Sequence, residues 1–418
     1  MCFVLMNPDP FIKTRPMFKN YLLTAVRNFA RNKAFSLINI LGLAIGITAS
    51  LVIFMIVYYE FSFDKYQKDR DRIYRVVMEA KFNGSEGYST GLPAPLHTAI
   101  VNEVTGVEAS VPVMQFQGDS KVMVNVTKEN KEDITIKKQE GIIFTNTEYF
   151  PLLGYKWLAG SPAVMGTPFN VVISKSRARQ YFAGLTYQEI LGAQITYNKD
   201  LTVKVAGIVD DLNENTIFNS SEFISYPTIA ETRLQENFMM KVWNDWMAYS
   251  LLYIKLAPGS TVAATEAQLT GLITKYNKDA NRDAANTQAF KLQPLDDIHF
   301  NQKFPAVGQR LGHKPTLYGL LAIGAFLLIL GCINFINLTT AQASKRAREI
   351  GIRKTMGGIK EQLVVQFLSE TFILTVIASV LAVILIPILL TMFADFIPPG
   401  LEFSFFNQKG ILVFFVVL

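Results

Sequence analysis

The sequence predicts an α-helical transmembrane bundle of three complete spans plus the start of a fourth, with a large α+β extracytoplasmic domain between spans 1 and 2. Three observations lead to this prediction. Long runs without a charged residue occur in separate parts of the chain, basic residues cluster beside them, and mixed strand and helix patterns separate the first run from the second. Only 18% of the residues are charged, against the roughly 25% that is usual in soluble domains.

The uncharged runs are long enough to cross a bilayer. They cover residues 34–59, 315–344 and 371–394, and each exceeds the roughly 20 residues that a transmembrane helix needs. A signal peptide is the alternative for the first run, because residues 48–50 are small. The apolar stretch continues well past them, so we interpret it as an uncleaved anchor. The predicted complete spans are therefore 35–59, 315–344 and 370–394.

The last part of the sequence predicts one more span. Residues 395–409 are expected to form a short external loop, and the apolar run that follows extends from Gly410 to Leu418. This run is too short to cross a bilayer. We interpret it as the start of a fourth span in a truncated chain; a short hydrophobic tail is the alternative.

Basic residues next to the membrane predict the orientation of the spans. Segments 1–34 and 341–370 each hold six basic residues, against one acidic residue in the first and three in the second, whereas the rest of the chain is net acidic. Two spans separate these segments, so both lie on the same side, which the positive-inside rule makes cytoplasmic. The domain between the first two spans then faces the periplasm or the cell exterior.

The cytoplasmic N-terminus, residues 1–34, contains an amphipathic helix pattern directly before the first span. Such basic helices usually lie among the lipid headgroups. We expect an interfacial anchor that contacts membrane lipid, and a regulatory role is the alternative. The apolar face holds Phe18, Leu22 and Phe29, and Arg27 and Arg31 lie away from it.

Small and polar residues in the spans predict helix packing. In the first span Gly42, Gly46 and Ser50 recur every four residues, which allows another helix to approach closely. In the second span Asn334 and Asn337 share a face, and amides need partners in lipid. We interpret these residues as interhelical contacts in a bundle or a dimer; a polar conduit is the alternative for the amides.

The extracytoplasmic domain, residues 60–314, mixes strand and helix patterns, which indicates an α+β fold. Turn-rich stretches near 160–162 and 213–221 indicate two subdomains, one inserted in the other. The domain has no cysteine, so it has no disulfide framework. The predicted strands are 171–173, 201–209 and 249–256, and the predicted helices are 174–182 and 265–276.

We find no catalytic constellation in the sequence. It contains no G-x-x-x-x-G-K-[ST] phosphate-binding loop. His97, His299 and His313 lack metal-ligand spacing, and we interpret them as structural or surface residues. The acidic pairs 210–211 and 296–297 are interpreted as turn or cap residues. We therefore expect no catalytic residue, cofactor or metal site. We also expect no nucleic-acid partner, because the basic excess lies beside the membrane.

The segment after the second span carries a family resemblance. Residues 345–358 read K-R-A-R-E-I-G-I-R-K-T-M-G-G, and residues 366–370 read Q-F-L-S-E. This resembles the signature of the FtsX-like and MacB-like family of ABC-transporter permeases, with Gly358 in place of the usual alanine. The intervening domain resembles the MacB-like periplasmic core domain, so the resemblance covers nearly the whole chain. Further similar stretches are 27–33, 64–66, 71–75, 171–182 and 203–210.

The resemblance implies that residues 345–369 form a cytoplasmic coupling helix and loop that docks on a separate ABC ATPase subunit. Glu349 and Arg353 have the favourable spacing and order for a helical ion pair, Ile350 and Met356 offer apolar anchors, and Gly357 can end the helix. A topology signal is the alternative, although that would need only charge. The implied ATPase-coupling residues are Arg346, Glu349, Ile350, Gly351, Ile352, Arg353, Lys354, Met356 and Gly357.

The function implied by the resemblance is a permease subunit in the bacterial inner membrane that works by mechanotransmission. A separate ATPase, which binds the ATP, would drive movement of the periplasmic domain for export or extraction of a lipoprotein, peptide or small amphiphile. Other implied partners are a homo- or heterodimer mate, or a second half of the same chain, and a periplasmic adaptor. The alternatives are a transmembrane sensor or receptor, a membrane-anchored enzyme, and an ATPase-driven activator of cell-wall hydrolases.

Overall fold

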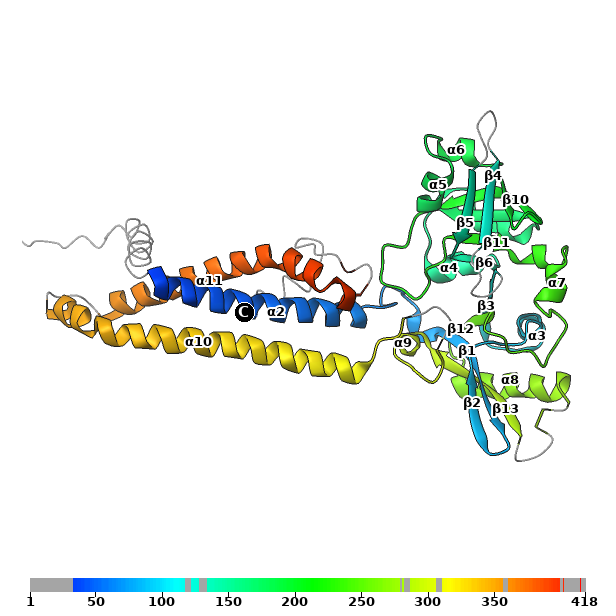
Figure 1. Cartoon of the computed structure of the whole chain (residues 1–418). Coiled ribbons are helices and arrows are strands. Elements are labelled where there is room, and N and C mark those ends of the chain that lie inside the picture. Colours follow the sequence, from blue (N-terminus) through cyan, green and yellow to red (C-terminus); the bar gives the residue numbers. More distant parts are fainter. Residues whose placement is uncertain are drawn as a thin grey trace, which may run out of the picture. The chain divides into compact units, whose positions relative to one another are not determined.

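The computed structural model describes residues 33–116, 122–127, 134–278, 280–281, 286–305, 310–355, 360–398, 401 and 414. These residues belong to two compact units (Figure 1). One unit holds the long helices, with the chain up to Phe61 and from Lys314 onward, and we name it the membrane unit. The other comprises Ser62–His313, and we name it the intervening domain.

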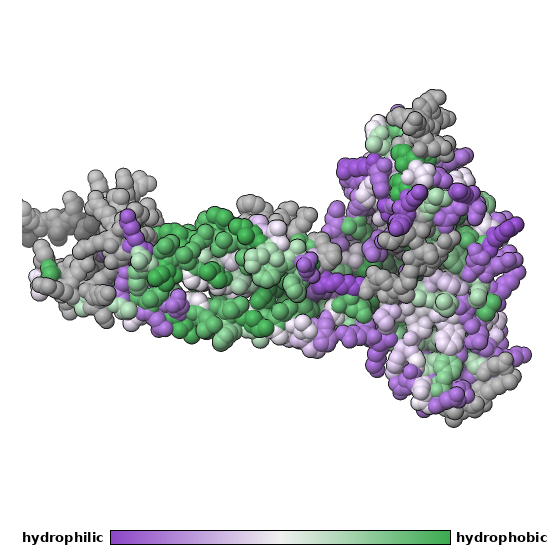
Figure 2. Space-filling view, viewed as in Figure 1, coloured by the Kyte–Doolittle hydropathy of each residue, from purple (hydrophilic) through white to green (hydrophobic). Residues whose placement is uncertain are grey.

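Three long helices in the described residues have the length and composition of membrane spans. Each contains an 18-residue stretch whose mean hydropathy lies between 2.4 and 3.0. Figure 2 shows apolar side chains gathered over these helices. The helices are α2 (Lys33–Phe61), α10 (Lys314–Thr355) and α11 (Lys360–Met392), and the short 3-10 turn η4 (Ala394–Phe396) follows them.

Helix α2 packs against both of the other helices, and its buried residues are mostly small or aliphatic. Ala44 and Ile47 form one buried cluster with Ala378 and Ala382 of α11. The hydroxyl of Thr48 donates to the Ala44 carbonyl at 2.6 Å, which satisfies this polar group inside the bundle. A second cluster, nearer the end of α2, contains Leu51, Val52, Met55 and Ile386.

Helix α10 is longer than the predicted second span. It continues unbroken from Lys314 through Thr355, so residues 345–355, predicted as a separate coupling helix, extend the spanning helix. Residues 341–354 are mostly strong helix formers, and no proline interrupts them. Helix α11 likewise begins at Lys360, well before the predicted start of the third span at residue 370.

Two predicted parts of the membrane unit lie outside the described residues. These are the interfacial helix, within residues 1–32, and most of the predicted fourth span. Within 410–418 the structure describes Phe414, whose ring centroid lies 5.6 Å from that of Phe54 in α2.

The strands of the intervening domain form a continuous sheet. The order is β13-β1-β12-β3-β6-β11-β8-β10-β9-β4-β5, with β2 paired to β1 and β7 paired to β10. The strands are β1 (Ile73–Phe82), β2 (Ser85–Ser89), β3 (Val107–Gln115), β4 (Val122–Thr127), β5 (Ile134–Gln139), β6 (Ile142–Thr145), β7 (Trp157–Ala159), β8 (Asn170–Ser174), β9 (Gln194–Tyr197), β10 (Leu201–Val209), β11 (Glu222–Ser225), β12 (Ser250–Leu256) and β13 (Thr287–Pro294).

Short helices connect these strands. They are α3 (Leu96–Glu103), α4 (Tyr149–Leu153), α5 (Lys175–Tyr181), α6 (Tyr187–Ile190), α7 (Leu234–Asn237), α8 (Val262–Tyr276) and α9 (Leu295–Ile298), with 3-10 turns η1 (Arg70–Arg72), η2 (Pro162–Gly166) and η3 (Tyr226–Ile229). The predicted strands and helices of this domain correspond to β8, β10, β12, α5 and α8.

The chain order gives the domain two wings. The first wing is a β-α-β-β-α-β arrangement of β1, α3, β3, β12, α8 and β13, with antiparallel pairs throughout. Both helices pack on one face, where Leu96 and Ile100 of α3 and Leu269 of α8 join one core. Residues 116–249, inserted between β3 and β12, form the second wing. Both wings share the one sheet and belong to one compact unit.

Candidate functional site

The predicted small residues of α2 lie against α10. A Cβ added to Gly46 would be 3.3 Å from the Leu327 carbonyl oxygen and 3.5 Å from the Gly331 Cα. One turn later, the Ser50 hydroxyl donates to the Gly324 carbonyl at 2.7 Å. Backbones approach this closely only where side chains are small, so the stripe forms a helix–helix contact.

Both predicted amides of α10 are exposed within the described residues, and one of them borders α2. A Cβ added to Gly42 would be 2.8 Å from Nδ2 of Asn334, so this amide lies directly beside α2. Asn337, one turn further along α10, is also exposed within the described residues. Asn39 of α2, which the sequence did not single out, is 1% exposed, and its amide atoms have no hydrogen-bond partner among the described residues. Burying an amide without a hydrogen-bond partner destabilises the folded state. The burial of Asn39 follows from the packing of the helices, which the sequence alone does not reveal.

A cavity of about 230 Å³ lies between the three helices, at the end of the bundle next to the predicted coupling segment. Its polar lining includes Thr339 and Thr340 of α10 and Glu370 of α11, and Phe35 of α2 closes one side. Glu370 is 7% exposed. An ionisable residue buried inside a membrane bundle usually faces other helices and marks a functional position.

The implied ATPase-coupling residues up to Lys354 lie on the last turns of α10. Ile352 is 53% exposed, and nothing lies within 4 Å of a Cβ added to Gly351, so this face is open in the described residues. For Arg346, Glu349, Ile350, Arg353 and Lys354 the structure describes the helical backbone alone, and Met356 and Gly357 lie outside the described residues. Helical spacing places positions 346, 350 and 353 on one face, with 349 beside 353.

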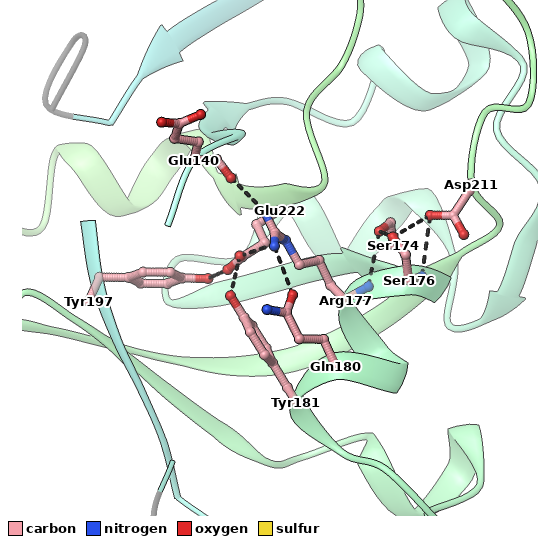
Figure 3. A network of polar contacts seen from close by, with 9 residues as sticks. All are labelled: Glu140, Ser174, Ser176, Arg177, Gln180, Tyr181, Tyr197, Asp211 and Glu222. Atoms are coloured by element: carbon pink, nitrogen blue, oxygen red, sulfur yellow. Dashed lines mark hydrogen bonds and ion pairs between the residues drawn. The ribbon is translucent and has the colours of Figure 1, made fainter. Parts of the chain in front are cut away.

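The second wing of the intervening domain is organised around a buried carboxylate, Glu222 of β11 (Figure 3). The hydroxyls of Tyr181 and Tyr197 each donate to it at 2.5 Å, and Nε of Arg177 lies 3.2 Å from Oε1. Burial raises the pKa of Glu222, and the two tyrosines and the arginine oppose this rise. Arg177 also donates to the Glu140 carbonyl, so the network ties α5, β9 and β11 to the end of β5.

A second polar cluster lies beside the first, at the start of α5. Ser174 caps this helix, and the carboxylate of Asp211 accepts from the hydroxyl of Ser176 at 2.7 Å and from its backbone N–H at 3.3 Å. The Lys175 ammonium lies 2.9 Å from Asp210 and lowers the pKa of that carboxyl. The pair 210–211 therefore holds the end of β10 against α5, in line with its interpretation as turn and cap residues.

A groove of about 1,120 Å³ opens on the second wing. It lies between the β9–β10 turn, at Lys199 and Asp200, and the segment 230–237. Glu231, Arg233 and Glu236 add charges of both signs to its lining. Its size suits a drug-sized ligand or a short stretch of peptide.

The histidines take part in structural contacts. His97 Nδ1 lies 2.9 Å from the Ser110 hydroxyl, and burial lowers the pKa of His97 to about 4. His299 is 2% exposed and stacks on Phe63. Among the described residues no three histidine, cysteine or acidic side chains gather as metal ligands would.

Aromatic residues of the segment 243–249 pack within the domain. The Trp243 ring stacks on Tyr276, with centroids 4.4 Å apart, and the Trp246 ring stacks on Phe82 at 5.3 Å. These contacts agree with packing rather than with an open binding surface.

Contrary to the expectation that the sequence holds no catalytic motif, residues 87–91 form a G-x-S-x-G pattern, which can mark a nucleophilic serine. Ser89, its central residue, lies at the end of β2 rather than on a strand-to-helix turn. Its hydroxyl bonds to the backbone of Gly91 and Trp246, so it closes a turn. The pattern therefore has a structural role here.

The described residues combine helices of membrane-spanning length with a large α+β domain between the first two, and family models identify the class of membrane protein. Residues 36–272 match the MacB-like periplasmic core domain, and residues 321–418 match the FtsX-like permease C-terminal region. The first match alone covers more than half of the chain, so this protein belongs to the MacB-like and FtsX-like ABC-transporter permeases. The resemblance in the sequence is thus confirmed.

Curated relatives carry the same family names. The macrolide export ATP-binding/permease protein MacB of Bradyrhizobium diazoefficiens is 23% identical over 395 residues, which are 93% of this chain and 55% of that protein. MacB of Campylobacter jejuni is 24% identical over 44% of this chain and 29% of that protein. The uncharacterized ABC transporter permease YknZ of Bacillus subtilis is 36% identical over 18% of this chain and 19% of that protein. The chain thus spans about half, or less, of the length of these relatives.

Two solved structures are also similar to part of the chain. A domain assigned to a permease protein of Porphyromonas gingivalis is 19% identical, with a TM-score of 0.43, and the match covers 61% of this chain and 98% of that one. The periplasmic region of MacB from Actinobacillus actinomycetemcomitans is 15% identical, with a TM-score of 0.36, over 56% of this chain and 94% of that one.

Proposed function

We propose that this permease works by mechanotransmission. A separate cytoplasmic ABC ATPase would bind ATP and move the coupling segment at the end of α10, and the spans would carry this movement to the intervening domain in the periplasm. One observation carries the proposal: α10 is an unbroken helix of 42 residues, which at 1.5 Å per residue is about 60 Å long. It exceeds the roughly 45 Å thickness of a bilayer with its headgroups, so one element reaches from the coupling residues to the intervening domain.

Side-chain exposure supports the coupling segment as the docking site of the ATPase. Ile352 is a large apolar residue that is more than half exposed on the part of α10 beyond the span. The sequence around it adds basic and acidic residues, which suits a contact that needs both an apolar anchor and charge pairing. The N-terminus and this segment would then be cytoplasmic.

The proposed substrate is a periplasmic or membrane-derived lipoprotein, peptide or small amphiphile. The groove on the second wing, with its charged residues of both signs, suits the polar part of such a substrate better than an acyl chain. A second copy of the chain, or a second half of it, and a periplasmic adaptor would complete the machine. The MacB relatives are named for macrolide export, which would make a macrolide-like small amphiphile one candidate substrate.

A transmembrane sensor is less well supported than a permease. A sensor of this layout would place a long signalling helix or a kinase after the second span. Here α11 begins at Lys360, directly after α10 ends at Thr355. An activator of cell-wall hydrolases is a second candidate of the same ATPase-driven type. It would differ from an exporter only in the partner that the periplasmic domain contacts.

Co-purification tests the proposed coupling. The protein is purified from native membranes in mild detergent, as wild type and as Glu349→Lys/Arg353→Glu, and ATPase activity is assayed in both. We expect an ABC ATPase with the wild type and its loss with the double swap. The matched control is Glu103→Lys/Lys275→Glu, which swaps an exposed pair 2.6 Å apart in the intervening domain and should keep the ATPase. If no ATPase accompanies the folded wild type, the proposed function fails.

A further inference from the structure

The two linkers that join the intervening domain to its membrane helices meet inside that domain. The first linker follows α2 and begins at Ser62, and the second precedes α10 and ends at His313. The Phe63 ring of the first linker stacks on the imidazole of His299, with centroids 3.8 Å apart and planes 4° apart. The backbone N–H of Gly312 donates to the His299 carbonyl at 2.8 Å. His299 therefore contacts both linkers.

The contact with Gly312 leaves no room for a larger residue. A Cβ added there would be 2.8 Å from the ring of Phe300 and 3.0 Å from Nε2 of His299. The second linker is also held by Arg75, which is fully buried and donates to the Phe304 carbonyl at 2.8 Å. The same guanidinium donates to Gln293 at 2.7 Å, so the linker is fixed to β1 and β13 of the sheet.

The first linker is fixed to the second wing. Oδ1 of Asp64 accepts from the Thr216 hydroxyl at 2.5 Å, and the Asp64 backbone N–H donates to the Asn215 carbonyl at 2.8 Å. The side chain of Asn215 donates to the Ser62 hydroxyl at 2.6 Å. Residues 215–216 belong to the segment that follows β10. Asp211, at the start of this segment, holds it against α5.

Asp64 occupies an unfavourable position. Its φ is 56°, in the left-handed region that non-glycine residues seldom adopt. Its side chain is 1% exposed, and its Oδ2 has no hydrogen-bond partner among the described residues. Residues that combine strain with an unsatisfied buried group persist where the surroundings force them and where function uses them.

We propose that Phe63, Asp64 and His299 form a joint that holds the two linkers together and passes movement of the spans to the intervening domain. The inference rests on the proposed mechanotransmission and names the positioning residues it needs. Phe63 and His299 fix the linkers to each other, so displacement of one helix end relative to the other must shear this stack. Asp64 carries the displacement to the segment after β10, and through Asp211 to α5 of the second wing.

Hydrogen exchange on the full-length complex from native membranes, with its ATPase, tests the joint. Exchange is compared with and without a non-hydrolysable ATP analogue. In the wild type we expect the nucleotide to change protection at the coupling end of α10 and also in residues 62–67, 211–218 and 299–305. In Phe63→Ala and His299→Ala we expect the change at the end of α10 to persist and the change in the intervening domain to be lost.

Two variants separate transmission from folding. His299→Phe keeps a flat ring against Phe63 and should restore the wild-type pattern. Phe82→Ala removes the partner of Trp246 in a similar stack away from the linkers and should leave the pattern unchanged. A wild-type nucleotide response in the intervening domain of His299→Ala overturns the joint while leaving mechanotransmission intact. No nucleotide response in the intervening domain of the wild type overturns the proposed function, and the joint with it.

Discussion

Gly46 of α2 and Gly331 of α10 face each other across the helix contact. A Cβ added to Gly46 would be 3.5 Å from the Gly331 Cα, and one added to Gly331 would be 3.7 Å from the Gly46 Cα. The two backbones are therefore nearly in van der Waals contact, and any relative movement of these helices must slide along a surface of small residues. This surface determines which substitutions the bundle tolerates.

We predict that Gly46→Leu destabilises the full-length protein by about 1–3 kcal/mol, because the added side chain meets the backbone of α10 and forces the helices apart. Gly319→Leu is the matched control, since nothing lies within 4 Å of a Cβ at that position of α10. It should be neutral or slightly stabilising. Thermal unfolding in detergent measures both. Equal losses for the two variants would show that α2 and α10 do not pack as described.

Asp64→Asn should stabilise the protein in a pH-dependent way. Burial raises the pKa of Asp64 from 3.8 to about 6. A raised carboxyl pKa means that the folded state binds the proton more tightly than the unfolded state. The contribution of Asp64 to the free energy of unfolding is therefore fully present below about pH 4, and it is lost as the pH rises through 6. Between these two pH ranges the free energy of unfolding falls by about 3 kcal/mol, at 1.36 kcal/mol for each unit of difference in pKa.

The asparagine variant removes this titration and suits the left-handed backbone at position 64. We expect its unfolding temperature to exceed that of the wild type at pH 8 and to match it near pH 4. Calorimetry of the full-length protein at both pH values measures the difference. An advantage of the same size at both pH values would contradict a titration of Asp64 as the cause.

Tyr197→Phe should destabilise the second wing, because it removes a hydrogen bond to the buried Glu222 carboxylate. Such bonds to charged groups contribute about 1.5–3 kcal/mol. The tyrosine stabilises the ionised form of Glu222, so the loss should be larger at pH 8 than at pH 4. Tyr276→Phe removes an exposed bond to Glu103 and should change stability by less than about 0.5 kcal/mol. Chemical denaturation followed at both pH values tests the pair.

Ile352→Ser should leave stability within about 0.5 kcal/mol of the wild type, because the side chain is more than half exposed. We expect it nevertheless to weaken association with the ATPase by about tenfold or more, as loss of an apolar anchor would. Quantitative co-purification measures the association. The control is Phe396→Ser. Phe396 is 81% exposed and lies in η4, beyond the end of α11 that is far from the coupling segment, so this variant should keep the ATPase. Retention of the ATPase by both variants would place the docking site elsewhere.

Local patterns predicted the parts of the fold that depend on local properties. The apolar runs marked three spanning helices because crossing a bilayer requires a continuous apolar length, which any window of sequence reveals. Strand 201–209 and helix 265–276 were predicted because their periodicity reflects one buried face. The sequence did not predict the full length of α10. The drop in hydropathy after residue 344 marks where the membrane-spanning part ends, but the helix itself continues to Thr355.

The sequence by itself determined the membrane class, the α+β domain between the first two spans and the family. These follow from composition, periodicity and contiguous motifs, which need no knowledge of distant contacts. Only the tertiary structure decided which residues meet: Phe63 with His299, Asp64 with Thr216, and Glu222 with Tyr197. These partners are far apart along the chain, and a single sequence carries no signal of their proximity. The joint between the linkers arises from the order of strands in the sheet, which brings both membrane connections to the same place.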